Sequence, residues 1–411
     1  MLKKLFLFFK FFCGIALLAF LTLAIYIAVC IPKSEIPVAE RYSSDKLNIN
    51  NVESILQGIK ALTFHDDFLY CQKDNFIVRT KDFGKTFEHV ADIDYSNLST
   101  FYKAFMGSDI FRRIARIEVH RLKIAPNGNI AFTTKGGVYL IPAGEKKGAL
   151  ISKTPESRPI SLTVDKDNHF YYGEYISNPE RRGVNVFKSS PDGKLWEKVY
   201  TYPEKTIRHI HAVEFDPYEN CVWIATGDDN SETFLTRASL DFKDVKTVLH
   251  GDQKNRYFEI RVLPDKLFLT PDAPNGDDYV TIYDKKSGKE NRILKVEGVT
   301  FFSTILGNYF ICATSNEPYA KGSCEYLNTH VWAINIDTLQ ARKIAIFGTD
   351  FLYRFSLMNE ICPIPGLFQF SNAFFPEGKS PDTTKLIIFG NGLEDINRNS
   401  AIWNVSELLS F

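Results

Sequence analysis

One segment that is predicted to form a β-hairpin has two histidines near its start and two aspartates near its end. The segment IRHIHAVEFDPYENCVWIATGDDN covers residues 207–230, with His209 and His211 near its start and Asp228 and Asp229 near its end. Side chains two positions apart in a strand point to the same side, so the imidazoles face together and Arg208 faces away. Because the turn DPYEN brings the second strand back along the first, the aspartates return to the same edge as the histidines.

Imidazole and carboxylate groups at one edge allow two kinds of site. His209 and His211 suit a metal ion or a hydrogen-bonded ligand. Ordinary buried histidines of a channel wall are the alternative. The segment TGDDNSE has aspartate spacing similar to that of a calcium loop but lacks the full ligand set. No cofactor is therefore predicted, while a divalent metal at His209 and His211 is left open.

Pairs of carboxyl groups suggest acid–base catalysis. The candidate catalytic residues are Glu174, Asp228 and Asp272, each near the end of a predicted strand. Glycoside hydrolysis generally uses two carboxyl groups on either side of the substrate-binding site. Loop carboxylates also cap turns or face water, so the catalytic pair is a hypothesis.

A basic segment and several loop residues are candidates for ligand binding. The segment RRIARIEVHR, residues 112–121, could hold an anionic sugar, and a solvated strand edge is the alternative. A concave mouth rich in carboxylates, imidazoles, arginine and tyrosine is the default place for a ligand. The predicted ligand-binding residues are Arg113, Arg116, His120, Tyr175, His209, His211, Gln253, Arg256 and Glu317.

A repeat in the sequence supplies the elements that position these residues. Each unit has an apolar strand, a short Asp/Asn/Gly turn, a second apolar strand and two further strand-like pieces. Such units begin near residues 59, 119, 159, 207, 257, 300 and 367, a spacing of roughly 40 to 60 residues. Repeated four-stranded units predict an all-β β-propeller, with seven blades favoured over six or eight. A β-sandwich, the alternative, does not explain so long a period.

Two turns indicate the class of propeller. The segment RTKDFGKTFEHV, residues 79–90, resembles the Asp-box of sialidase-like propellers, and SSPDGKLWEKVY, residues 189–200, is a shortened copy. In such a turn the Asp side chain accepts backbone N–H groups and Gly supplies the left-handed residue. The structural residues are Thr80, Asp82, Gly84, Thr86 and Phe87 in the first turn and Ser190, Asp192, Gly193 and Trp196 in the second.

The chain resembles bacterial sialidase-like (BNR/Asp-box) β-propeller proteins of poorly characterised function. The matching segments are GEY, RHIHAVEFDPY, WIATGDD, GDQKNRYFEI and TPDAPN. The resemblance covers most of the chain after the N-terminal segment, and it implies the fold and the choice of mouth residues without implying an activity. An Arg-Ile-Pro near the first strand is missing, and no arginine triad with a Tyr/Glu pair can be assigned. Sialidase activity itself is therefore not expected.

The N-terminus predicts a membrane anchor. Lys3, Lys4 and Lys10 precede residues 11–31, a stretch without charge that is long enough for one bilayer span. Lysines before the span place the N-terminus in the cytoplasm and the bulk of the chain outside. A cleaved signal peptide is the alternative. The predicted organisation is a cytoplasmic N-terminus (1–10), a transmembrane anchor (11–31), a linker (32–55) and a propeller domain (56–411).

Charge and cysteine content narrow the function further. The chain has 49 basic and 49 acidic residues, which gives no electrostatic reason to expect nucleic acid as a partner. Its seven cysteines include no C-x-x-C, so a zinc ribbon is not supported and buried free thiols are favoured. A bridge between Cys312 and Cys324 is the alternative.

Together these features predict a single-pass protein of the cell membrane that binds a carbohydrate or a protein of the envelope at its central mouth. A glycan-processing enzyme, either a glycoside hydrolase or a polysaccharide lyase, would use the same mouth. A scaffold for protein interactions is the third reading. Fold alone does not decide among these functions, since propellers host many of them.

Overall fold

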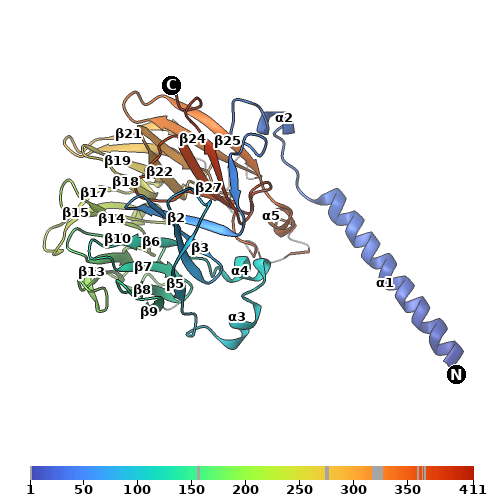
Figure 1. The fold of residues 1–411 in the computed structure, drawn as a ribbon. Coiled ribbons are helices and arrows are strands. Elements are labelled where there is room, and N and C mark those ends of the chain that lie inside the picture. Colours follow the sequence, from blue (N-terminus) through green and yellow to red (C-terminus); the bar gives the residue numbers. More distant parts are fainter. Residues whose placement is uncertain are drawn as a thin grey trace.

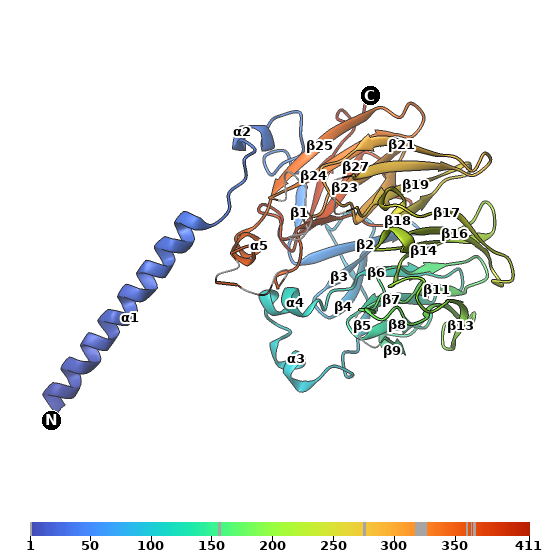
Figure 2. The ribbon, with the colours of Figure 1, turned by 180° about the vertical axis from the view of Figure 1, so that it is seen from behind.

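The computed structural model describes residues 2–154, 158–273, 277–316, 327–358, 361–362, 364 and 367–411. A long helix, α1 (Leu2–Cys30), projects away from a body built of short strands (Figures 1 and 2). The side chains of α1 are described from residue 16 onward. Within the described part of the chain, none of the helices combines the length and the apolar character that a bilayer crossing requires.

The strands of the body form antiparallel sheets in which chain order is largely kept. One sheet of eight contains β2 (Ile59–His65), β3 (Phe68–Lys73), β4 (Phe76–Thr80), β5 (Glu88–Ile93), β6 (Arg121–Ile124), β7 (Ile130–Thr134), β8 (Gly137–Ile141) and β9 (Lys147–Lys153). Its two halves meet through a short parallel pairing of β5 with β9.

The remaining sheets have four strands each. The first contains β10 (Thr163–Val164), β11 (Phe170–Gly173), β12 (Val184–Ser189) and β13 (Trp196–Tyr202). The second contains β14 (Ile210–Asp216), β15 (Cys221–Thr226), β16 (Phe234–Ser239) and β17 (Val245–His250). The third contains β18 (Tyr257–Val262), β19 (Lys266–Pro271), β20 (Tyr279–Asp284) and β21 (Glu290–Lys295). Another is β22 (Phe302–Leu306) to β25 (Ala341–Gly348), with β23 (Tyr309–Ala313) and β24 (Asn328–Asn335). The last is β26 (Asn372–Phe374), β27 (Lys385–Asn391), β28 (Ser400–Asn404) and β1 (Ser54–Leu56).

The first strands of successive sheets contact one another around a ring. β2 contacts β6, and the contacts continue through β10, β14, β18 and β22 to β26. The ring is completed by contacts of β2 with β27 and by the pairing of β1 with β28. In Figure 1 the colours pass around the body in chain order, as this ring requires. The predicted all-β fold is confirmed, and its arrangement is propeller-like.

The core lies between neighbouring sheets. Every residue of β15 (CVWIAT) is buried, because this strand has sheets on both of its faces and needs no alternation of polar side chains. Trp223 of β15 packs against Tyr283 of β20 in the next sheet, with ring centroids 5.6 Å apart. The outer strand β17, by contrast, has no buried residue. Burial of side chains therefore falls from the second strand of this sheet to its outer strand.

The turn between β4 and β5 has the hydrogen bonds expected from its sequence. The carboxylate of Asp82 accepts from the backbone N–H of Thr86 at 2.9 Å and from the hydroxyl of Thr80 at 2.7 Å. Gly84 has φ +91°, and Phe87 packs against the neighbouring core. Hydrogen bonds, the first from the Thr86 N–H, lower the pKa of Asp82 to about 2. In the shorter copy the hydroxyl of Ser190 donates to Asp192 at 2.5 Å, Gly193 has φ +76°, and Trp196 lies against the core.

Residues 32–55, predicted to be a linker, contact the body along much of their length. Leu47 is buried, and its N–H donates to the carbonyl of Ile344 at 2.8 Å. The indole of Trp403 donates to the carbonyl of Asn48 at 2.9 Å. The segment also contains a short helix, α2 (Val38–Arg41), and the start of β1. Its polar composition reflects side chains on the outer surface of the body rather than a free tether.

Short helices occupy several of the loops between strands. They are α3 (Thr100–Phe105), α4 (Asp109–Ala115), α5 (Phe351–Ser356) and the 3-10 helices η1 (Asn230–Glu232) and η2 (Gln253–Asn255). Cys71, Cys221, Cys312 and Cys362 are buried free thiols, as predicted, while Cys324 lies outside the described residues.

Candidate functional site

The hairpin of β14 and β15 brings the histidines and aspartates together. Ile210 pairs with Thr226, so His209 and Asp228 lie just beyond the same end of the hairpin. The register shifts between Ile210 and Ala212, which makes His211 the extra residue of a β-bulge. Bulges re-aim side chains, and equivalent shifts occur at Leu62 in β2 and Phe258 in β18. The predicted common edge is therefore confirmed.

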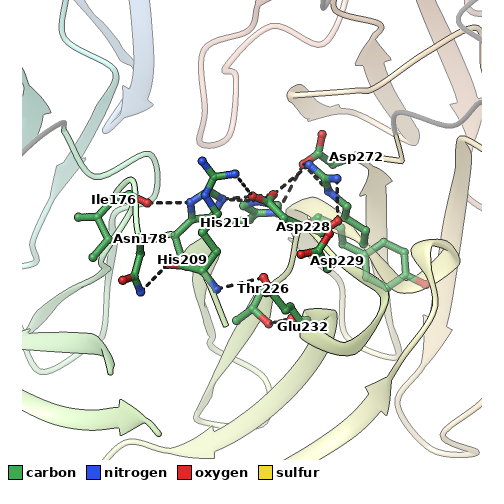
Figure 3. Close-up of polar contacts among 12 residues, drawn as sticks. Ile176, Asn178, His209, His211, Thr226, Asp228, Asp229, Glu232 and Asp272 are labelled. Atoms are coloured by element: carbon green, nitrogen blue, oxygen red, sulfur yellow. Dashed lines mark hydrogen bonds and ion pairs between the residues drawn. The ribbon is translucent and has the colours of Figure 1, made fainter. Parts of the chain in front are cut away.

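The two imidazole rings are fixed by backbone carbonyl groups. Nδ1 of His209 lies 3.1 Å from the carbonyl oxygen of Ile176, and Nδ1 of His211 lies 3.1 Å from that of Tyr257. A carbonyl oxygen can only accept, so both Nδ1 atoms carry the proton. Figure 3 shows the resulting arrangement, in which the Nε2 atoms of the two rings turn toward each other and toward Asp228. The Nε2 atoms are 3.0 Å apart.

Asp228 completes this cluster. Its Oδ1 atom lies 3.4 Å from Nε2 of His209 and 3.6 Å from Nε2 of His211. Burial alone would raise the pKa of Asp228, but the interactions with the two histidines hold it well below its usual value. Burial lowers the pKa of His209. Asp228 is therefore a carboxylate.

Two arginines also hold the aspartates of the site. Arg256 Nη2 lies 3.0 Å from Asp228 Oδ1 and 3.1 Å from Asp272 Oδ2. Arg208, predicted to face away from the histidines, nevertheless reaches Asp228 Oδ2 with Nη1 at 2.9 Å. Because both aspartates are ion-paired, neither is suited to be the protonated acid of a glycosidase.

A cavity of about 360 Å³ opens beside this cluster. Four arginines lie on its wall, and the ring of Tyr175 lies tilted against that of His209 with centroids 4.2 Å apart. Two further hollows adjoin it, because they share Arg208 with it. The arginines are Arg116, Arg158, Arg208 and Arg256, and the phenylalanines are Phe258, Phe301, Phe302, Phe370 and Phe374.

Arg158 is a half-buried cation of this cavity whose charge is poorly compensated. Its Nη1 atom donates to the carbonyl of Arg116 at 2.7 Å, and its Nη2 atom lies 3.4 Å from Nδ1 of His120. Its Nε atom is buried and has no hydrogen-bond partner among the described residues. No ion pair joins Arg158 to a carboxylate within the described part of the chain. Burial lowers the pKa of Arg158 to about 10, which measures the cost of holding this charge there.

His120 supplies the second unsatisfied donor of the cavity, after Nε of Arg158. The residue is 8% exposed, and burial, followed by the charge of Arg158, lowers its pKa well below the ordinary value. Since Nδ1 faces a guanidinium, it accepts, and the proton of the neutral ring is on Nε2. In the described residues Nε2 of His120 meets no hydrogen-bond partner. A ligand with acceptor atoms would satisfy this donor.

Further along β6 and β18, buried side chains form a network of ion pairs. Glu377 is buried and pairs with Arg121 at 2.7 Å, Lys123 at 3.0 Å and Arg261 at 3.2 Å. Burial alone would raise the pKa of Glu377, but the three cations lower it strongly. This network connects β6 and β18 to the loop after β26.

Most of the predicted site residues lie together. His209, His211, Asp228, Asp272, Arg256, Tyr175, Arg116 and His120 line the cavity, and Gln253 lines the adjoining hollow. Arg158, Arg208 and the phenylalanines were not predicted. The phenylalanines could have been found from their places at strand entries, as Phe258 occupies the same bulge position as His211. Arg158 lies before β10, where no strand pattern marks it.

Two predicted residues do not join the site. Glu174 turns to its own sheet, where its Oε2 atom accepts from the backbone N–H and the side-chain amide of Asn185, each at 2.7 Å. Arg113 is buried and forms an ion pair with Asp350 at the start of α5. Both predictions are corrected, because each side chain is already committed to a structural partner. Glu317 lies outside the described residues.

Comparisons with known proteins add information on the fold. No protein-family model matches the chain, and no curated protein matches it. The extracellular domain of the one-component system BT4673 from B. thetaiotaomicron is similar in structure, with a TM-score of 0.51 and 11% identity over 88% of this chain. This chain spans 43% of the length of that protein. A chain of the mitotic checkpoint complex has a TM-score of 0.50 and 11% identity, with 91% of this chain and 96% of that chain covered. At such low identity these likenesses establish a propeller-like all-β fold and nothing about activity.

Proposed function

We propose that the cavity at the central mouth binds an acidic carbohydrate. The observation that carries this proposal is the pair of buried donors without acceptors, Arg158 Nε and His120 Nε2, on one cavity wall. A buried donor without an acceptor costs about 1–3 kcal/mol, and more for a charged group. A carboxylate of the ligand would remove this cost. It would also neutralise the guanidinium of Arg158.

The aromatic wall supports a ring-shaped ligand over a small inorganic anion. Phe258 and Phe301 pack with centroids 4.3 Å apart, and Phe302 and Phe374 with centroids 3.9 Å apart. Ligand sites are usually lined by apolar and aromatic side chains, with a few polar groups that orient the ligand. A sugar ring can pack its apolar face against such a wall, and its hydroxyl groups can form hydrogen bonds with Asp272 and Asn372. The acidic group then lies toward Arg158.

A glycan-processing enzyme is the alternative, and a protein scaffold the second alternative. For a hydrolase, Glu174 is occupied by Asn185 and the carboxylates of Asp228 and Asp272 are ion-paired to Arg256. A lyase would need a base beside a neutralised uronate, and His209 with Tyr175 offers the nearest candidate. Release of an unsaturated product from a bound uronate would establish the lyase alternative.

The place of the protein in the cell is a separate proposal. The uncharged residues 11–31 after three lysines support a single-pass anchor with the body outside the cytoplasm. If the eight-stranded sheet is counted as two units, the sheets support seven four-stranded blades with β1 closing the last. The turns at Asp82 and Asp192 support a sialidase-like class of propeller. Resistance of the full chain to alkaline extraction from membranes would test the anchor.

Calorimetric titration with an oligogalacturonate tests the site. Arg158→Met keeps the length of the side chain and removes the charge, and we expect binding at least about tenfold weaker, since hydrogen bonds to charged groups contribute about 1.5–3 kcal/mol. Arg79→Met is the matched control, because Arg79 lies outside the mouth in a surface pair with Glu88 at 2.9 Å. Equal affinity of wild type and the Arg158→Met variant would rule out the proposed site.

A further inference from the structure

We propose that His209, His211 and Asp228 bind one divalent transition-metal ion of the zinc type at the edge of the mouth. The three side chains each offer one ligand atom, and these atoms lie within 4.8 Å of one another. Imidazole nitrogen with carboxylate oxygen is a ligand set that zinc, nickel and cobalt accept. The proposal does not rest on carbohydrate binding, because the metal alone is its probe.

The orientation of the imidazole rings is the first argument. Metal-binding histidines usually donate the N–H of the other ring nitrogen to a carbonyl or carboxylate, which fixes the ring and its tautomer. Both rings have this feature here, through Ile176 and Tyr257. With both Nδ1 atoms protonated, the Nε2 atoms of neutral rings present lone pairs. Two lone pairs and a carboxylate oxygen then face one point in space, and a cation is the partner that satisfies all three.

The distances between the ligand atoms are the second argument. A tetrahedral zinc ion with bonds of about 2.0–2.1 Å holds its ligand atoms about 3.3 Å apart. The two Nε2 atoms are 3.0 Å apart, and Oδ1 of Asp228 lies 3.4 and 3.6 Å from them. The three separations are therefore those of a zinc site. No rearrangement of the backbone is needed to reach them.

Burial is the third argument. The side chains of His209 and His211 are 7% and 1% exposed, and that of Asp228 is 14% exposed. The three residues nevertheless line the mouth cavity, so a fourth ligand can reach the ion from solvent. A site with three protein ligands and one open position is the usual form of a zinc site that engages a further molecule.

Arg256 is the neighbour that competes with a metal ion. Its Nη2 atom lies 3.0 Å from the same Oδ1 atom of Asp228. The guanidinium has a second anchor, because Nε and Nη2 each lie 3.1 Å from Oδ2 of Asp272. It can therefore remain at Asp272 while Oδ1 of Asp228 coordinates the ion. The alternative explanation of the cluster is a proton shared between the Nε2 atoms of the two rings. In that case the protein would bind no metal ion at this position.

Metal titration of the full chain after treatment with a chelator tests the proposal. We expect one equivalent of Zn²⁺ to bind with a rise in melting temperature, and Co²⁺ to give the visible absorption of a four-coordinate ion. His211→Ala should weaken binding at least about a hundredfold, since the loss of one of three ligands removes more than a supporting partner would. His89→Ala is the control, because His89 is exposed beside Asp92 on β5 and would report surface chelation.

A second variant protects the test against failure to fold. Asp228→Asn keeps the shape of the side chain and removes its charge, so weaker Co²⁺ binding with altered absorption is expected. Absence of stoichiometric binding, or equal binding by wild type and the His211→Ala variant, would overturn the metal site. Loss of metal binding without loss of oligogalacturonate binding would leave the proposed function intact. The reverse outcome would leave the metal site intact.

Discussion

At the scale of single residues, the mouth contains one pair of donors without acceptors and one pair of histidines that face a carboxylate. Arg158 and His120 keep donors without acceptors within the described residues. His209 and His211 are each fixed at Nδ1 and open at Nε2 toward Asp228. Buried donors are normally satisfied, so the first pair requires an explanation. A bound anion would supply the acceptors that the first pair lacks, and the metal ion proposed above would be bound by the second pair.

Asp278 gives a prediction for the dependence of stability on pH. The residue is 2% exposed, and burial, followed by repulsion from Asp272, raises its pKa to about 7. The folded state thus keeps this proton to a higher pH than the unfolded state. The free energy of unfolding therefore falls as pH rises from about 4 to about 7, by on the order of a few kcal/mol.

Asp278→Asn should remove this part of the pH dependence. An asparagine oxygen can still accept from the N–H of Ala273, which now donates to Asp278 at 3.0 Å. Urea unfolding of both proteins at several pH values measures the difference. The stability of wild type relative to the variant should decrease across the range, and a constant difference would show that folding does not shift the pKa of Asp278.

The sequence predicts the acidic and imidazole residues of the site better than the basic ones. His209, His211 and Asp228 lie within one hairpin, so local geometry determines that they meet. Arg113 finds its partner Asp350 after a separation of 237 positions, which no local pattern reveals. Glu174 reaches Asn185 on the neighbouring strand, and its own strand end gave no sign of that pairing. The partners of long side chains depend on tertiary structure, and for this reason the predictions for Arg113 and Glu174 were wrong.

At the scale of elements, the inner strands do more than line a channel. β6 carries Arg121 and Lys123, β18 carries Glu259 and Arg261, and all four are joined through buried ion pairs that include Glu377. Each carboxylate here has more than one cation. These contacts link sheets that are far apart in sequence and hold the inner strands in register.

Glu377→Gln should destabilise the protein strongly. Removal of one member of a buried charge network leaves the others uncompensated, which typically costs about 3–5 kcal/mol. Chemical unfolding of wild type and variant measures the change in free energy. Glu88→Gln breaks an exposed pair with Arg79 and serves as the control, with an expected change below about 1 kcal/mol. Similar losses in the two variants would contradict this role of the network.

The element pattern was also the most predictable part of the sequence. Alternating apolar strands and Asp/Asn/Gly turns predicted the hairpins that begin with β2, β14 and β18. The turn at Asp82 has the hydrogen bonds that its residues suggest. The bulge at His211 was not predicted, because a one-residue shift of register depends on the neighbouring sheets.

At the scale of the molecule, the N-terminal and C-terminal parts of the body meet in one sheet. β1 pairs with β28 through Ser54, Ile55 and Leu56. Leu47 and Asn48 add a buried side chain and a carbonyl acceptor for Trp403. This closure joins the ends of the ring. It also explains why residues predicted to be a linker belong to the folded body.

Truncation should reveal the contribution of this closure. A chain that begins at residue 45 keeps β1 and the contacts of Leu47 and Asn48, whereas a chain that begins at residue 58 loses them. We expect the shorter chain to melt several degrees lower and to aggregate, because β28 becomes an unpaired edge. Differential scanning calorimetry of both chains measures this effect. Equal melting temperatures would show that the ring does not need β1.

The central claim is that the mouth selects an acidic carbohydrate. The most direct test compares the affinity of the full chain for an oligogalacturonate with its affinity for the same oligosaccharide after chemical reduction of its carboxyl groups. The account predicts measurable binding of the acidic form and at least about tenfold weaker binding of the reduced form, since one charge-assisted contact contributes about 1.5–3 kcal/mol. Equal affinity for the two forms, or binding of neither, would contradict it.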